Sequence, residues 1–116
     1  MGGGVALAQA PDANWLVGKW RGVFEGNRQR SGPQIVIRSD GTFEGEAPSS
    51  LVGLIRYQKG KWRTAGDTVI LEYFVSSTLG SSEVTWTLKR NGEDLEGSGI
   101  RHSDSFQGSV KLKKIE

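Results

Sequence analysis

The residue types best suited to chemistry gather at His102-Ser103-Asp104-Ser105, which holds the components of a hydrolytic triad in one short run. Members of a triad must converge in space and orient one another, and neighbours in a single loop rarely do so. A turn rich in serine and aspartate explains the run more simply. No glycine-rich phosphate loop follows a strand and opens a helix. The sequence therefore predicts no catalytic residue and no nucleotide site.

Metal and cofactor chemistry is limited by composition. The chain has no cysteine and one histidine, which excludes disulfides, zinc–thiolate sites, thiol nucleophiles and His-rich metal sites. His102 alone could ligate a haem iron, and Glu72 is the one carboxylate within an apolar strand. However, His102 falls in a surface turn and alternation directs Glu72 outward. We expect no metal and no cofactor, and a haem-binding or enzymatic barrel is the third hypothesis.

Length and charge exclude further classes. The 116 residues suffice for one domain, and no apolar run approaches the ~20 residues of a membrane span. Fifteen Lys and Arg face thirteen Asp and Glu, for a net charge of +2. Basic and acidic residues are interspersed, which is typical of a solvated surface and not of a nucleic-acid interface.

The first fourteen residues differ from the rest of the chain. Ala8-Gln9-Ala10 before Pro11 has the small-x-small form that signal peptidases accept, although no basic residue precedes it. Residues 1–14 are read as a flexible N-terminal segment or a leader remnant, and both readings stay open. Residues 15–116 are expected to form one β-barrel domain. A periplasmic or secreted location is the corresponding prediction.

Strict alternation of apolar and polar residues dominates from Trp15 onward, with the period of half-buried strands. Short turn signals such as Asp40-Gly41 and Asn91-Gly92 separate these stretches. Closing a meander covers its apolar face and both of its edges. We predict an all-β, eight-stranded antiparallel up-and-down barrel, with a two-sheet sandwich as the alternative. The expected strands lie near 19–25, 34–38, 43–46, 59–63, 69–75, 83–89, 94–101 and 105–113.

The predicted inward face mixes very large and very small side chains. Glycine inside a strand costs stability, so a structural requirement must hold it there. Either tight coiling sets each large ring over a glycine in a filled core, or aromatic residues line a cavity with a glycine floor. The aromatic members are Trp20, Phe24, Phe43, Trp62, Tyr73, Trp86 and Phe106, and the glycines are 22, 45, 60, 97, 99 and 108.

Two further features bear on a site. The segment 47–55 carries Leu51, Val52, Leu54 and Ile55 where a tight turn would suffice, so we expect a loop that acts as a lid or as an apolar portal. Arg101 falls on the inward face, where it either caps the barrel by stacking on a tryptophan or anchors an anion.

Gly18-Lys19-Trp20 on the first predicted strand resembles the Gly-x-Trp signature of the calycin superfamily, which includes lipocalins, fatty-acid-binding proteins and avidins. The chain is similar to small lipocalin-like domains of exported bacterial proteins. In lipocalins the signature tryptophan packs under a basic side chain from late in the barrel, for which Arg101, Lys111 and Lys113 are the candidates. The lipocalin disulfide and C-terminal helix are missing. Gly18-x-Trp20-x-Gly22 also resembles the opening motif of nitrobindin-like haem barrels.

The first functional hypothesis is a non-enzymatic, lipocalin-like barrel that binds a small apolar or aromatic ligand. The alternative is a protein-binding barrel that docks through residues 48–55, such as an inhibitor of a secreted hydrolase or a subunit of an envelope assembly. The predicted ligand-binding residues are Trp20, Phe24, Phe43, Leu51, Leu54, Trp62, Tyr73, Trp86, Arg101 and Phe106.

Overall fold

Antiparallel strands make up nearly all of the computed structural model, which describes residues 14–26, 29–49, 53–77 and 80–115. A single turn of 3₁₀ helix, η1 (Asn14–Leu16), precedes the first strand. The strands are β1 (Gly18–Gly26), β2 (Gln29–Ser31), β3 (Gln34–Ile37), β4 (Thr42–Ser49), β5 (Gly53–Ala65), β6 (Thr68–Ser77), β7 (Gly80–Asn91), β8 (Asp94–Arg101) and β9 (Phe106–Lys114).

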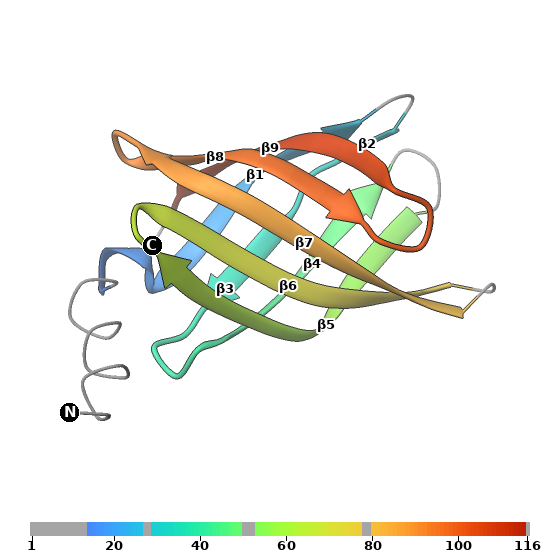
Figure 1. Ribbon diagram of the computed structural model, residues 1–116, viewed down its shortest axis with the longest axis horizontal. Helices are drawn as coiled ribbons and strands as arrows, with labels where there is room; N and C mark the ends of the chain where they lie inside the picture. Colours follow the sequence, from blue (N-terminus) through green and yellow to red (C-terminus); the bar gives the residue numbers. More distant parts are fainter. Residues whose placement is uncertain (1–13, 27–28, 50–52, 78–79, 116) are drawn as a thin grey trace.

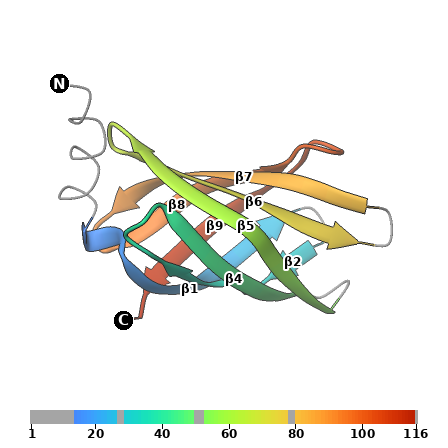
Figure 2. The same ribbon diagram turned by 90° about the horizontal axis from the view of Figure 1, so that it is seen from below.

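The strands close into a barrel (Figures 1 and 2). From β3 onward each strand pairs with the next, and β9 returns to pair with β1 from Trp20↔Lys114 to Gly26↔Gly108. β2 and β3 together occupy one strand position in the barrel wall, because both pair with β1 and only Gly32 and Pro33 separate them. Proline has no N–H to give to a ladder, which accounts for the break. The predicted eight-stranded meander is confirmed, and its closure excludes the two-sheet sandwich.

One end of the barrel is closed by η1 and the start of β1. Trp20 is 1% exposed, and its Nε1 donates to the Leu16 carbonyl at 2.8 Å. The Lys114 ammonium donates to the Trp15 carbonyl at 2.8 Å and lies 6.0 Å from the centre of the Trp20 ring. The basic side chain over Trp20 is thus Lys114, and the expectation of Arg101, Lys111 or Lys113 in that place is wrong.

The middle of the barrel is filled with side chains. Trp20, Phe43, Trp62, Tyr73 and Trp86 are all buried, as their alternation predicts. Gly99 and Gly108 face each other across β8 and β9, directly under the ring of Phe24. A Cβ on Gly108 would stand 2.6 Å from a ring carbon of Phe24. These glycines make room for the aromatic ring above them, so the filled-core reading holds for the body of the barrel.

A β-bulge interrupts the alternation of β5. Phe43 pairs with Gly60 and Gly45 pairs with Tyr57, so three steps on β5 oppose two on β4. The same extra residue appears against β6, and Lys59 adopts a positive φ of 56°. A bulge of one residue reverses which side chains face inward. Tyr57 is therefore buried, although it is three residues from the inward Gly60.

The segment predicted as a loop at 47–55 is largely strand. Ala47–Ser49 belongs to β4 and Gly53–Ile55 to β5, and the two pair directly with each other. The loop expectation is wrong because a longer hairpin continues the barrel wall there. Residues 1–13, 27–28, 50–52, 78–79 and 116 lie outside the described residues, and with them the leader-like segment, Leu51 and Val52. Within the described part, no helix is long and apolar enough to cross a membrane.

Candidate functional site

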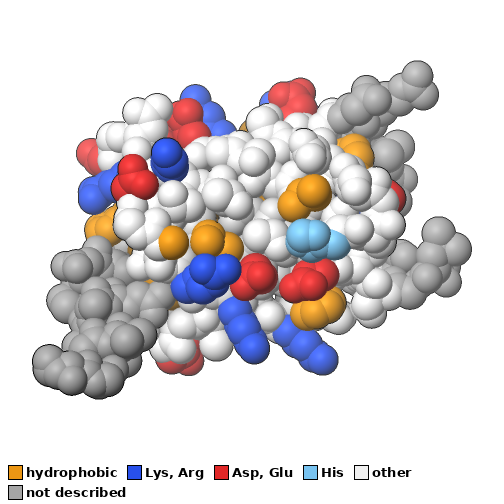
Figure 3. Space-filling model, in the orientation of Figure 1, with side chains coloured by type: hydrophobic (Ala, Val, Ile, Leu, Met, Phe, Trp, Pro, Cys, Tyr) orange, Lys and Arg blue, Asp and Glu red, His pale blue; other side chains and the backbone are white. Residues whose placement is uncertain are grey.

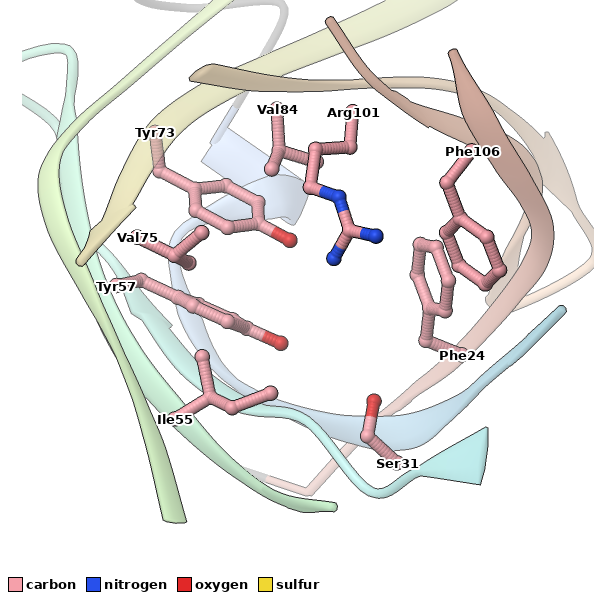
Figure 4. A pocket seen from close by; sticks show the side chains of 9 residues that line it. All are labelled: Phe24, Ser31, Ile55, Tyr57, Tyr73, Val75, Val84, Arg101 and Phe106. Carbon is pink, nitrogen blue, oxygen red and sulfur yellow. The ribbon is translucent and has the colours of Figure 1, made fainter. Parts of the chain in front are cut away.

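A recess opens at the end of the barrel opposite η1 (Figure 4). Its enclosed space is about 50 Å³, and the total reaches about 420 Å³ when the mouth, which is open to solvent, is included. Pockets for small molecules span about 300–1,000 Å³, so the enclosed part holds only a portion of a ligand and the remainder would lie at the open mouth. Its lining residues are Phe24, Ser31, Ile55, Tyr57, Tyr73, Val75, Val84, Arg101 and Phe106.

One wall of the recess is a stack of two phenylalanines. Phe24, near the end of β1, and Phe106, at the start of β9, have ring centres 6.2 Å apart with 21° between their planes. Figure 4 shows their flat faces side by side, across the recess from Ile55 and Val75. Aromatic and aliphatic walls of this kind favour a flat apolar ligand.

The opposite wall carries the only two tyrosines of the chain, Tyr57 and Tyr73. Their ring centres are 4.1 Å apart, and both hydroxyls point into the recess (Figure 4). Burial raises the pKa of Tyr57 and raises that of Tyr73 well above its ordinary value, with the neighbouring Tyr57 adding to the effect. Both hydroxyls therefore remain protonated at physiological pH. Because the two side chains also hydrogen-bond to each other, one of their two protons is left for a ligand.

Arg101 brings the positive charge of the recess. Its Nε donates to Asp104 Oδ1 at 3.0 Å, its Nη2 donates to Oδ2 at 2.8 Å, and its guanidinium lies 4.9 Å from the centre of the Phe106 ring. This pairing and the Phe106 N–H hold the pKa of Asp104 down at about 2. Arg101 faces inward as predicted, but it stacks on Phe106, which lies opposite it in the ladder, and not on a tryptophan.

Trp86 lies directly beneath these groups and is fully buried. Its ring meets Tyr57 and Tyr73 edge-on, with centres 5.7 and 5.4 Å away, and packs against Phe24. Its Nε1 has no hydrogen-bond partner within the part of the chain that the structure describes. A buried donor without a partner is costly, so this N–H is a notable feature of the floor.

Nine of the ten predicted site residues lie in the described part of the chain, and Leu51 does not. Phe24, Tyr73, Arg101 and Phe106 line the recess. Trp86 lies beneath them, whereas Trp20, Phe43 and Trp62 pack in the body and closed end of the barrel. Leu54 is 51% exposed on the outer face of β5.

Sequence reasoning missed several residues that line the recess. Tyr57 was missed because the bulge at Lys59 breaks the alternation that Gly60 and Trp62 establish. Ile55 was expected only as part of an apolar lid or portal and not as a residue of the lining. Ile55 and Tyr57 do alternate with Arg56 and Gln58, which is the signal that could have found them. Ser31 has no such signal, since Pro33 interrupts its strand.

The triad-like run does not assemble a triad. His102 Nε2 bonds to Thr85 Oγ1 at 2.8 Å, Ser103 Oγ to Ser82 Oγ at 3.0 Å, and Asp104 to Arg101. The single histidine is exposed on the face shown in Figure 3, among interspersed acidic and basic groups. Among the described residues, no three His, Cys, Asp or Glu side chains could together hold a metal ion.

Fold and site together define a closed antiparallel meander barrel with one packed end and one recessed end lined by aromatic rings and hydroxyls. Comparison with protein-family models, curated proteins and solved structures found no match to this chain.

Proposed function

We propose that the protein is a lipocalin-like binding barrel that takes a small aromatic ligand into the recess at its open end. The observation that carries the proposal is the Phe24–Phe106 stack, which faces two inward-pointing tyrosine hydroxyls across the recess. The body of the barrel is filled, so the ligand is seated at the mouth and reaches down only to the level of Tyr57 and Tyr73.

The size of the recess sets the expected affinity. A ligand of two fused rings that buries about 150 Å² of apolar surface gains roughly 4 kcal/mol before the costs of association. Hydrogen bonds from Tyr57, Tyr73 or Ser31 add about 1 kcal/mol each. The gross total of about 7 kcal/mol leaves about 3 kcal/mol or less after the costs of association, so we expect millimolar or weaker dissociation constants and rapid exchange of the ligand.

The closed end supports the calycin resemblance. Trp20 of the Gly18-Lys19-Trp20 motif lies beneath Lys114 from the last strand, as the resemblance implies for the signature tryptophan. We propose on this basis that the chain is a small lipocalin-like domain, and that it acts outside the cytoplasm.

A titration followed by NMR tests the binding proposal. Naphthalene-1-methanol, which is neutral, is expected to shift the amide signals of Gly99 and Gly108 saturably, because both glycines lie under the Phe24 ring. Gly41, in a turn at the opposite end, should not respond. Absence of saturable shifts at Gly99 and Gly108, or equal shifts at Gly41, would contradict the proposal.

Two leucine variants localise the binding. Phe24→Leu removes one ring of the stack and is expected to weaken binding about tenfold. Phe74→Leu makes the same change at a side chain on the outer face of β6, and its affinity should stay within about twofold of the native value. Equal losses in the two variants would show that the effect does not come from the recess.

The second candidate function is a protein-binding barrel, which the exposure of Leu54 favours. Leu54 is 51% exposed on the outer face of β5, close to the mouth, and belongs to the segment 48–55 expected to dock a partner. Inhibition of secreted hydrolases by the native protein, lost in Leu54→Ser with naphthalene-1-methanol binding unchanged, is the result this alternative requires.

A further inference from the structure

We propose that the recess selects aromatic ligands that carry a carboxylate, and that Arg101 is the group that receives it. The inference rests on the proposed function and adds the charge and the polar group of the ligand. Two observations carry it: the donors in the lining and the hydrogen bonds of Arg101.

The polar lining of the recess is rich in donors. Arg101, Tyr57, Tyr73 and Ser31 are its polar residues, and Figure 4 shows their polar atoms pointing toward a common centre. Among the described residues that line the recess there is no carboxylate, amide or imidazole. The arginine can only donate. One tyrosine proton is used in the hydrogen bond between Tyr57 and Tyr73, which leaves the other tyrosine proton and that of Ser31 for a ligand. A carboxylate, with two oxygens and about four acceptor sites, matches such a set better than a neutral group.

Arg101 is held in place and still has donors to spare. Its Nε and Nη2 are engaged by Asp104, and its face lies on Phe106. Its Nη1 makes no hydrogen bond within the described part of the chain. Asp104 is not among the lining residues, and its side chain is more exposed than that of Arg101, 53% against 32%. The pair therefore fixes the guanidinium from the solvent side and leaves a pre-organised donor for an anion.

The floor of the recess supports the same polarity. Trp86, which forms this floor, is an indole and so offers a donor but no acceptor, and its ring meets Tyr57 and Tyr73 edge-on from below.

The substrate class follows from these neighbours. The ring of the ligand lies against Phe24 and Phe106, and its carboxylate reaches Arg101 and the tyrosine hydroxyls. The enclosed space is about 50 Å³, so a ligand of one or two rings enters only in part and keeps its remainder at the open mouth. Aryl carboxylic acids such as naphthoates and arylacetates fit these limits.

The test compares 1-naphthoate with the neutral isostere 1-naphthamide by calorimetry at about neutral pH. The native protein is expected to prefer the carboxylate by about tenfold or more, because hydrogen bonds to a charged group are stronger than neutral ones. Arg101→Met keeps an apolar side chain over Phe106 and should abolish the preference, so that the variant binds the two probes with equal affinity.

Arg90→Met is the matched control. Arg90 also lies over an aromatic ring, 4.3 Å from the centre of Trp15, but at the closed end of the barrel. The Arg90→Met substitution removes the same charge as Arg101→Met and should leave the preference for the carboxylate intact. The inference is overturned if the native protein binds both probes equally. It is also overturned if the preference survives Arg101→Met or disappears in Arg90→Met. In each of these cases, binding of naphthamide would still support the proposed function. If neither probe binds, the proposed function itself fails.

Discussion

Tyr57 and Tyr73 are the only tyrosines in the chain, so the phenolate absorbance of the whole protein reports on the recess alone. Burial raises the pKa of both hydroxyls above the ordinary value of 10.0. We predict that neither tyrosine ionises while the barrel is folded. In the unfolded chain both should ionise near pH 10 as exposed phenols do.

The size of the effect follows from proton linkage. Well above pH 10 the unfolded chain holds two protons fewer than the folded barrel at these sites, so the free energy of unfolding falls as pH rises. Each proton contributes about 1.4 kcal/mol per pH unit, and the pair contributes about 2.7 kcal/mol per pH unit. A barrel stable by about 5 kcal/mol would reach its unfolding midpoint about two pH units above 10 from this cause alone.

The assay is an alkaline titration followed by near-ultraviolet absorbance and far-ultraviolet circular dichroism together. Phenolate absorbance is expected to appear in one cooperative step that coincides with loss of strand signal. Tyr57→Phe and Tyr73→Phe should each halve the tyrosine-dependent slope, to about 1.4 kcal/mol per pH unit, in urea unfolding at a series of alkaline pH values. A reversible phenolate titration near pH 10 with the dichroism unchanged would refute the reasoning, because it would mean that the hydroxyls are solvated.

Three other predictions concern the scaffold. Gly97→Ala should destabilise the barrel by at least about 3 kcal/mol in urea unfolding, because its Cβ would stand 2.0 Å from a carbonyl oxygen of β7. Trp20→Phe should cost about 1–3 kcal/mol by the same measurement, because it leaves the buried Leu16 carbonyl without its donor. Asp104→Asn should flatten the acid dependence of stability: the folded pKa of Asp104 is lowered, so its stabilising pairing with Arg101 is complete above about pH 4 and is lost as pH falls through about 2.

Each of these three predictions has an outcome that would contradict it. Ser98→Ala, at the exposed neighbour of Gly97, should change stability by less than about 0.5 kcal/mol, and a similar effect at both positions would contradict the close-approach argument. Trp20→Phe with unchanged stability would show that the indole N–H contributes nothing. An Asp104→Asn variant with the native acid profile would show that Arg101 gains no stability from that carboxylate.

Alternation along the chain was sufficient to predict the barrel and most of its inward residues. Phe43, Val69, Trp86 and Leu112 are buried where the period of two places them. The prediction succeeds because a closed barrel has one interior. Wherever a strand alternates without interruption, every second side chain faces that interior. The turns at Gly41, Gly66 and Gly92 were predictable for a similar reason, since a positive φ there favours glycine.

The candidate site was harder to predict, because it lies where the period fails. The bulge at Lys59 depends on how β5 meets two neighbouring strands, and no local propensity of lysine indicates a positive φ. Sequence spacing identified Phe24, Arg101 and Phe106 one at a time. These three residues lie around the same recess as Tyr57 only because β9 pairs with β1 and closes the barrel.

The ends of the described chain meet far from the recess. Ile115 donates its backbone N–H to the Lys19 carbonyl, and Lys114 reaches the Trp15 carbonyl, so both ends lie at the closed pole of the barrel (Figure 1). A fusion partner or surface tether attached at either end would leave the opening unobstructed. The same proximity favours circular permutation: a short linker across the closed pole would allow new termini at the opposite rim, where they could serve as a deliberate gate over the opening.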